Sequence, residues 1–299
     1  MVPGREGDEL MHPYSTAAYA ATLSHVGHPF DVPEWGTHVI ARSIPGGGAD
    51  IIGTYPICAL PSDADIAGGM KRLKDAGFVS VTLVLDNHHR PDRLPGLYVR
   101  EFKQHYIHEG NQNSIAGGYR PSQDHRYKIR RSRRHVDARP IKLAGYLNEW
   151  CALYDGLVKR HILSGVHVFP RESFASLSQI GGIEAFGGFV GDELVCISIW
   201  AAHEGRAYSH LVASSERGYE LRASYAVMDA AIRNYADFDV INLGGSAGPG
   251  DRDDGLSQYK RGFCNTTSPS WLATAILDDE AYDKLSGDKV TEFFPSYRG

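Results

Sequence analysis

The sequence predicts an α+β protein of two domains of similar make, each with a mixed, mostly antiparallel sheet flanked by helices. The chain has 299 residues, which is enough for one large domain or two ordinary ones. In both halves, amphipathic helical runs and short β-rich runs follow the order helix, antiparallel strands, helix, strand. The polar, glycine-rich stretch "NQNSIAGGYRPSQD" separates the halves, so we expect domains over 12–124 and 125–299.

The first half begins with a loose tail over residues 1–11 and the helical run "STAAYAATLSHV". The runs "THVIARSI" and "DIIGTYPICAL" are β-rich, and "PGGGA" between them is typical of a hairpin turn. "SDADIAGGMKRLKDAG" opens with cap-type residues and ends in Gly77, as a helix does. The nearly continuous apolar run "FVSVTLVLD" predicts a strand buried on both faces, and "LYVREFKQHYIHE" predicts a further strand.

The second half repeats this pattern. Its helical runs are "AGYLNEWCALYDGLVKRHI", "FPRESFASLSQI" and "GYELRASYAVMDAAIRNYAD". "IEAFGGFVGDELVCISIWAAHEG" predicts two strands joined by a tight turn at Gly191 and Asp192. The runs "RAYSHLVASS", "FDVINLGG" and "SWLATAIL" complete the predicted strands.

Composition sets limits on location and partners. The formal net charge of −5 gives no overall attraction to nucleic acid, so such a partner would need a local basic patch. The four cysteines are far apart in apolar surroundings, as expected of reduced thiols. We see no signal peptide and no apolar run near the length of about 18 residues that a membrane span needs. We therefore expect a cytoplasmic protein without a membrane span.

The stretch "LGGSAGPGDRDDGLSQYKRGF" could be interpreted as a phosphate loop or as the nucleophile turn of a hydrolase. Neighbouring residues argue against both. A phosphate loop needs lysine and a hydroxyl residue where this chain has Asp251 and Arg252. The pattern G-x-S-x-G is met around Ser246, but Pro249 and charged residues follow instead of a helix. The last histidine of the chain is His210, so none follows the serine in the usual hydrolase order. We expect Ser246 not to be a nucleophile.

The histidines and cysteines do not predict a metal site. The sequence has no H-E-x-x-H motif and no cysteine–histidine cluster. His105 and His108 would lie on opposite faces of a strand, because side chains there alternate. We therefore expect no metal and no bound cofactor.

The second half resembles the GNAT-fold acyltransferases, and within them the Fem-type aminoacyltransferases. "HRYKIRRSRR" is similar to the basic segment that opens the second domain of that family, and "LYDGLVKRH" to its Tyr…Arg helix. "AYSHLVASS", "ASYAVMDAAI" and "FDVINLGGS" resemble its core strand, helix and strand. "DGLSQYKRGF" resembles the closing Gly-Leu-x-x-Phe-Lys-x-x-Phe, with Tyr259 in place of phenylalanine. The resemblance covers about residues 125–275, and it implies two tandem GNAT-like domains.

The resemblance implies an acyltransferase that forms an amide bond on an amine acceptor. The acetyl-CoA pyrophosphate motif is not met in "SSERGYELRA", which has one glycine, so fewer N–H groups would face a diphosphate. This favours aminoacyl-tRNA as the donor. The acceptor would be a small amine, a natural-product intermediate or a peptidoglycan precursor. The alternatives are an acyl-CoA-dependent N-acyltransferase and a non-catalytic GNAT-like binding module.

Three residues are candidates for catalysis. Lys260 would place a cation near the developing oxyanion, and by resemblance it contacts the terminal nucleotide of the donor. The alternative is a solvated lysine on a short amphipathic helix. Tyr208 and His210 lie two apart on one strand, so they would share a face and could orient the amine or relay its proton. The alternative is a sheet face covered by a helix.

Further residues are candidates for binding. An acidic loop could attract an ammonium acceptor through Asp251, Asp253 and Asp254, unless it is merely solvated. The segment 126–134 is a plausible phosphate contact, or else a helix whose arginines pair with carboxylates. Its basic and aromatic residues are Arg126, Tyr127, Lys128, Arg130, Arg131, Arg133 and Arg134. The predicted donor-binding residues are Tyr259, Lys260, Arg261, Gly244, Gly245, Arg130 and Arg131.

Overall fold

The computed structural model describes residues 11–89, 92, 94–110, 118–248, 253–287 and 291–299. The chain divides into two compact units, of which unit 1 is Met1–Lys103 with Pro269–Gly299 and unit 2 is Gln104–Ser268. The boundary predicted between residues 124 and 125 falls inside unit 2. The assignment of domains to 12–124 and 125–299 stays a prediction.

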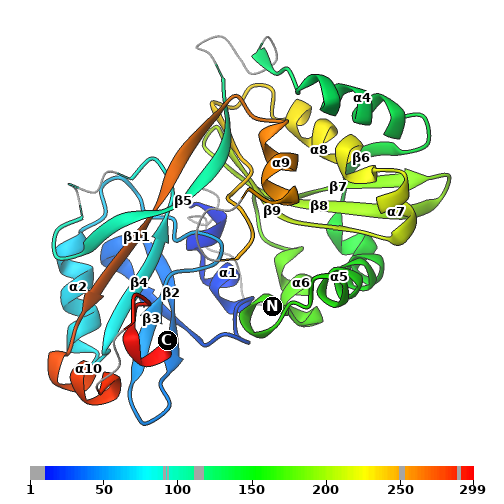
Figure 1. Ribbon diagram of the computed structural model, residues 1–299. Coiled ribbons are helices and arrows are strands. Elements are labelled where there is room, and N and C mark those ends of the chain that lie inside the picture. Colours follow the sequence, from blue (N-terminus) through cyan, green and yellow to red (C-terminus); the bar gives the residue numbers. More distant parts are fainter. Residues whose placement is uncertain (1–10, 90–91, 93, 111–117, 249–252, 288–290) are drawn as a thin grey trace. The chain divides into compact units, whose positions relative to one another are not determined.

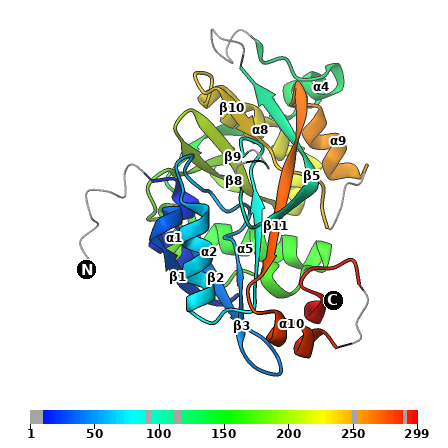
Figure 2. The same ribbon diagram turned by 90° about the vertical axis from the view of Figure 1, so that its left-hand side faces the viewer.

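Unit 1 is a sheet with one long helix against it. Its elements are η2 (Pro13–Ser15), α1 (Ala17–Ala21), β1 (His28–Val32), η3 (Pro33–Trp35), β2 (Thr37–Ser43), β3 (Ala49–Ile52), α2 (Ile66–Asp75), β4 (Ser80–Leu85), α10 (Asp279–Ser286) and η7 (Ser296–Arg298). The helix α2 lies along one face of these strands (Figure 1, Figure 2). Its residues Ile66 and Leu73 are buried in one cluster with Trp35 and Val81.

Two long strands begin in one unit and end in the other. They are β5 (Tyr98–Glu109) and β11 (Thr266–Ile276). In unit 1 the strand order is β1-β2-β3-β4-β11, in which β3 and β4 are parallel and the other pairs antiparallel. The part of β11 that lies in unit 1 pairs with β4.

Unit 2 carries the residues that the sequence singled out. Its elements are α4 (Gln123–Ser132), β6 (Asp137–Ile141), η5 (Leu143–Tyr146), α5 (Leu147–His161), η6 (Gly165–His167), α6 (Arg171–Leu177), β7 (Ile183–Val190), β8 (Glu193–His203), β9 (Arg206–Ser214), α7 (Glu216–Glu220), α8 (Ala223–Asn234), β10 (Val240–Asn242) and α9 (Gly255–Arg261). The strand order is β5-β10-β9-β8-β7-β6, in which only β9 and β10 are parallel among the described pairs. The predicted α+β class with a mixed, mostly antiparallel sheet is confirmed.

Helices cover both faces of the unit 2 strands. Figure 1 shows α4 and α8 on one side of β7, β8 and β9, and α5 and α6 on the other. Val227 of α8 is buried in a cluster with Trp200, Ala207 and Ile241 from three neighbouring strands. On the opposite face, α5 packs against β8 and β9. The strands β8 and β9 are therefore buried between two helical layers.

One predicted helix is interrupted. The run "GYELRASYAVMDAAIRNYAD" forms α7 and α8 rather than one helix, because Arg222 has a left-handed backbone with φ 55°. A left-handed residue cannot continue a right-handed helix. The turn places Leu221 against the core of unit 2. Packing thus outweighs the helical preference of the sequence at this point.

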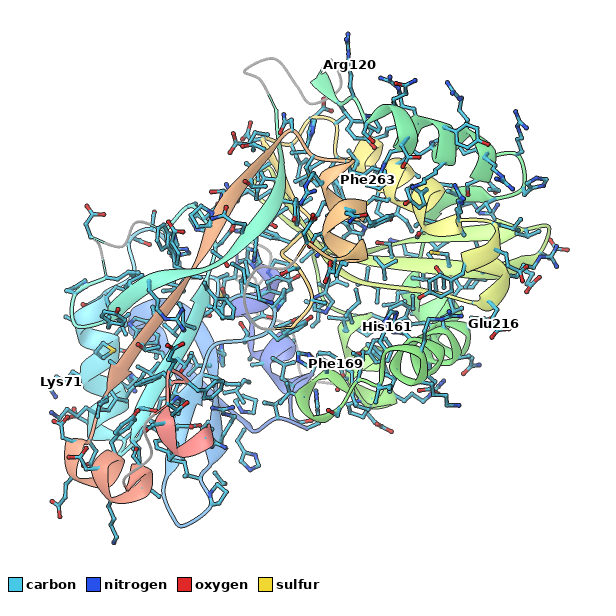
Figure 3. All side chains as sticks on the ribbon, in the orientation of Figure 1. Lys71, Arg120, His161, Phe169, Glu216 and Phe263 are labelled. Atoms are coloured by element: carbon cyan, nitrogen blue, oxygen red, sulfur yellow. The ribbon has the colours of Figure 1, made fainter. Side chains whose placement is uncertain are left out.

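An aromatic cluster joins α4, α8 and α9. His125 of α4 is buried and its Nε2 lies 2.8 Å from the carbonyl oxygen of Tyr259, so Nε2 donates this hydrogen bond. The His125 ring meets Phe263 edge-on, with centroids 4.7 Å apart, and Tyr225 packs against both Tyr259 and Phe263. Phe263 is labelled in Figure 3, just after the end of α9. This cluster holds the basic helix α4 against α9.

Two glycines at the ends of α9, its first residue Gly255 and its C-cap Gly262, provide a test of this packing. A Cβ added to Gly262 would lie 2.1 Å from Cε1 of His125, whereas one added to Gly255 would meet nothing within 4 Å. We expect Gly262→Ala to lower the free energy of unfolding by about 1–3 kcal/mol through overpacking. Gly255→Ala, the matched control, should be neutral or up to about 1 kcal/mol more stable. Urea unfolding of both variants checks this, and equal stabilities would contradict the packing described.

Candidate functional site

The parallel strands β9 and β10 part after three residue pairs. The last of these pairs is Tyr208 with Asn242, where β10 ends, whereas β9 continues to Ser214. Beyond Asn242 the chain remains with β5. The amide of Leu243 donates to the carbonyl of Tyr106 over 2.9 Å, and the amide of Tyr106 donates to the carbonyl of Gly244 over 3.1 Å. This point of separation is called the β9–β10 opening below.

A β-bulge lies on β9 close to this opening. Ile199 of β8 pairs with Leu211 and Trp200 pairs with Ser209, so His210 is the extra residue. A bulge breaks the alternation of side chains between the two faces of a strand. The inference that Tyr208 and His210 share a face because they lie two apart therefore does not follow from their spacing. Bulges often re-aim side chains next to functional sites.

Tyr208 and His210 are both buried. The Tyr208 hydroxyl accepts a hydrogen bond from Nε of Arg206 over 2.9 Å. Burial lowers the pKa of His210 to about 3. His210 is therefore neutral at physiological pH and binds a proton only weakly.

A glycine turn follows β10, made of Gly244 and Gly245. The side-chain oxygen of Asn242 accepts a hydrogen bond from the Gly244 amide over 2.7 Å, and Gly244 has a left-handed backbone with φ 73°. Only glycine adopts that conformation without strain. The carbonyl of Gly245 accepts a hydrogen bond from Nζ of Lys260 over 2.6 Å. The structure thus brings the predicted Lys260, Gly244 and Gly245 together.

The acidic residues near α9 have structural partners. Asp254 is the N-cap of α9 and accepts a hydrogen bond from the Ser257 amide over 2.8 Å, which lowers the pKa of its carboxyl group. Asp253 forms an exposed ion pair with Arg261 at 3.0 Å. Asp251 lies outside the described residues. The N-cap fixes the start of the helix that carries Lys260.

Tyr259 lies in the aromatic cluster described above. Its hydroxyl donates to the carbonyl of Ser224 over 2.9 Å, and burial raises its pKa well above the usual value. Its ring meets those of Tyr225 and Phe263, with centroids 5.0 and 5.2 Å away. The described contacts of Tyr259 are thus internal, and its role in donor binding stays a prediction.

The basic segment forms α4, whose two sides differ in character. His125, Ile129 and Ser132 are buried, while an exposed basic stripe covers the outer side. The stripe consists of Arg126, Arg130 and Arg131 on the helix and of Arg134 just beyond its end. In Figure 3 nitrogen atoms of the α4 side chains lie along the outer side of the helix.

The alternative of arginines paired with carboxylates holds for part of this segment. Arg133 lies 2.6 Å from buried Asp229, and Lys128 lies 2.6 Å from Asp124. No ion pair involves Arg130 or Arg131 within the part of the chain that the structure describes. These two arginines therefore present uncompensated charge to the solvent.

Sequence reasoning missed three residues around the opening. They are His105, Arg206 and Asn242, of which Asn242 was visible as the one polar residue between the strand "DFDVI" and the glycine pair. His105 lies 137 positions from its partner Asn242, so local sequence gave no signal for that contact. His105 and His108 do lie on opposite faces of β5, since His108 pairs with Ile241 and Ile107 pairs with Asn242.

Among the described residues, no group of three or more histidine, cysteine, aspartate or glutamate side chains is placed to hold a metal ion. In the same part of the chain, no helix combines the length and apolar character needed to cross a bilayer.

The buried state of His210 predicts a pH dependence of stability. Its pKa of about 3 in the folded protein lies below the ordinary value of 6.5, so the unfolded chain binds the proton more readily between these values. Stability is therefore lost as the pH falls through this window. From pH 7 to pH 5, wild type should lose about 2 kcal/mol more than His210→Gln. Urea unfolding at both pH values checks this, and parallel losses would show that His210 is not buried in its neutral form.

The fold is shared with several solved structures. FemX is 12% identical, with a TM-score of 0.64 over 95% of this chain and 98% of its own. The C-terminal domain of a protein described as a lysylphosphatidylglycerol synthetase from Agrobacterium fabrum is 11% identical, with a TM-score of 0.60 over 89% of this chain and 88% of its own. L-PGS from Bacillus licheniformis is 14% identical, with a TM-score of 0.56 over 89% of this chain and 93% of its own.

Sequence comparison adds no closer relative, since no protein-family model and no curated protein matches the chain. Similarity at such low identity establishes a common fold. The chain therefore has the fold of FemX and of the other two structures, which confirms the predicted α+β class and the resemblance in fold to a Fem-type protein.

Proposed function

We propose that this protein is an acyltransferase that transfers an aminoacyl group from aminoacyl-tRNA to an amine acceptor, forming an amide bond. One observation carries the proposal. The parallel strands β9 and β10 part at Tyr208 and Asn242, and the ammonium group of Lys260 is held on the glycine turn that follows β10. A cation fixed beside an opening between strands suits a reaction in which a carbonyl oxygen becomes negative.

The structural neighbours support the same class of reaction. One of them bears a name that describes the synthesis of lysylphosphatidylglycerol, and another is FemX, a member of the Fem-type proteins that the second half resembles in sequence. In the proposed reaction the acceptor nitrogen attacks the ester carbon, the carbon–nitrogen bond forms and the ester carbon–oxygen bond breaks. The proton that the amine loses ends on the departing ribose oxygen, so no further reactant is needed.

Lys260 has the central role in this proposal. Its positive charge attracts the oxyanion that develops on the carbonyl oxygen of the ester, or the 3′ end of the donor. The hydrogen bond to Gly245 and the N-cap at Asp254 position this charge before substrate binds. Preorganised charge of this kind costs no reorganisation during the reaction.

Tyr208 and His210 contribute as neutral groups. A histidine with a pKa of about 3 is a poor general base at neutral pH, so we assign His210 an orienting role toward the acceptor amine. Tyr208 lies at the last residue pair before the opening, with Arg206 donating to its hydroxyl. The aminoacyl ester is already activated, so positioning supplies most of the rate.

The region around α7 supports tRNA over acyl-CoA as the donor. The diphosphate of a CoA would be expected at the N-terminal end of this segment, where α7 has only five residues. Ser215 already accepts a hydrogen bond from the Gly218 amide over 3.1 Å, and Glu216, labelled in Figure 3, adds a negative charge to the first turn. A diphosphate would thus meet an occupied amide and a repelling carboxylate.

The basic stripe on α4 supports the same donor. Arg130 and Arg131 are exposed, and exposed arginine side chains suit contacts with a phosphate backbone. His125 ties α4 to the carbonyl of Tyr259, the residue before Lys260. Phosphates bound at α4 would therefore be held by the same packed cluster that positions Lys260. We also assign Arg261, which is exposed beside Asp253, to the donor.

The proposed acceptor is an amine, which is attracted to the protein as a positively charged ammonium group. The acidic residues Asp251 and Asp253 would attract an ammonium group toward the loop before α9, while Asp254 acts through its cap on the helix. A small amine and a peptidoglycan precursor both carry such a group.

Replacement of Lys260 tests the proposed mechanism. Lys260→Ala should lower the transfer rate by about 100- to 1,000-fold, because one contact to the oxyanion is lost. Lys260→Arg should restore the rate only in part, since a planar guanidinium places its charge differently from an ammonium. Gln258→Ala, an exposed change on the same helix, is the matched control and should behave as wild type. Single-turnover rates with charged tRNA, with circular dichroism as a folding check, decide the matter.

A loss within about threefold for Lys260→Ala would refute the role given to Lys260. Binding of charged tRNA without any transfer by wild type would favour a non-catalytic binding module. Transfer from acyl-CoA alone would favour an acyl-CoA-dependent N-acyltransferase.

Replacement of both stripe arginines tests the contact with RNA. Arg130→Gln with Arg131→Gln should weaken tRNA binding and make the slope of log K against log salt shallower by about 1–2, because up to two phosphates lose their partners. Lys71→Gln with Lys74→Gln on α2 is the control and should leave the slope unchanged. Filter binding over a salt series measures both, and equal slopes in the two double variants would contradict a phosphate contact at α4.

A further inference from the structure

We propose that Asn242 and His105 form a positioning pair that sets the glycine turn and, through it, the place of Lys260. The pair is buried, with Asn242 2% and His105 8% exposed. The structural part of this inference stands on the contacts alone, whereas its effect on rate rests on the proposed function.

The hydrogen bonds of Asn242 fix the orientation of its side-chain amide. An N–H can only donate, so the group that faces the Gly244 amide at 2.7 Å is the oxygen Oδ1. The NH₂ group therefore faces Nδ1 of His105 at 3.2 Å. Nδ1 must accept this hydrogen bond, which assigns His105 the neutral tautomer that carries its proton on Nε2.

The same amide controls the conformation of the turn. Asn242 Oδ1 holds the amide of Gly244, whose backbone is left-handed with φ 73°. The next carbonyl, that of Gly245, binds Nζ of Lys260 at 2.6 Å. A Cβ on Gly244 would lie 3.3 Å from that Nζ, so the turn and the ammonium group are in close contact. A change in the turn would therefore move Lys260.

The register of the sheet places this pair at the β9–β10 opening. Asn242 pairs with Tyr208 of β9 on one side and with Ile107 of β5 on the other. His105 lies two residues from Ile107 and so shares the face of Asn242. The pair thus lies beside the last residue pair of the parallel ladder.

Two substitutions of similar size separate the two hydrogen bonds. Asn242→Asp keeps an oxygen that accepts a hydrogen bond from the Gly244 amide. Its second oxygen replaces the NH₂ group that faces Nδ1 of His105, and this oxygen can only accept. His105 must then place a proton on Nδ1, so its tautomer changes while the turn persists. Asn242→Leu removes both hydrogen bonds. His108→Phe is the matched control, because His108 is buried on the other face of β5.

The experiment combines ¹⁵N NMR of the histidine rings with transfer kinetics. We expect His105 to carry its proton on Nε2 in wild type and on Nδ1 in Asn242→Asp. The amide resonance of Gly244 should persist in Asn242→Asp and His108→Phe and shift in Asn242→Leu. In transfer assays kcat should fall about 10-fold in Asn242→Leu with KM for the acceptor unchanged, and stay within about threefold in Asn242→Asp.

The outcomes separate this inference from the proposed function. A wild-type His105 protonated on Nδ1, or an Asn242→Leu variant with the Gly244 resonance and kcat of wild type, would overturn the positioning pair. The predicted NMR changes in a protein without transfer activity would leave the pair in place and refute the acyltransferase. If Asn242→Leu does not fold, the tautomer of His105 in wild type and in Asn242→Asp still decides.

Discussion

The separation of β10 from β9 after Asn242 is the constraint on which the rest of the site depends. The parallel ladder ends at this pair, while the chain after β10 keeps its backbone hydrogen bonds with Tyr106 of β5. Gly244 permits this course through its left-handed backbone, and the carbonyl of Gly245 then receives Lys260. A continued ladder would close the opening and leave that lysine without its anchor.

Two sets of contacts fix α9, the helix that carries Lys260. One lies toward the basic helix α4 and the other toward the acidic residues that precede α9. On one side, His125 and its aromatic neighbours join α4, with its basic stripe, to α9. On the other, Asp254 caps the start of α9, and Asp253 pairs with Arg261 in solvent. Lys260 lies on the helix that both sets of contacts fix. Packing and capping therefore fix the helix, and the carbonyl of Gly245 receives the ammonium group of Lys260.

Much of the fold could be predicted from local sequence, because the spacing of apolar residues and the positions of turn residues depend on local structure. The hairpin turn at Gly191 and the placing of Lys260 near the glycine pair both follow from short motifs. The break at Arg222 and the bulge at His210 could not be predicted, since packing against distant elements sets both. The contact between His105 and Asn242 likewise depends on which strands become neighbours.

Direct comparison of donors tests the central claim, that the opening between β9 and β10 serves aminoacyl-tRNA. Equilibrium binding of charged tRNA, uncharged tRNA and acetyl-CoA would be measured side by side at one ionic strength, because affinity for nucleic acid depends on salt. We expect binding of both tRNAs, tighter for the charged form, and no binding of acetyl-CoA. Saturable binding of acetyl-CoA together with no binding of either tRNA would contradict it.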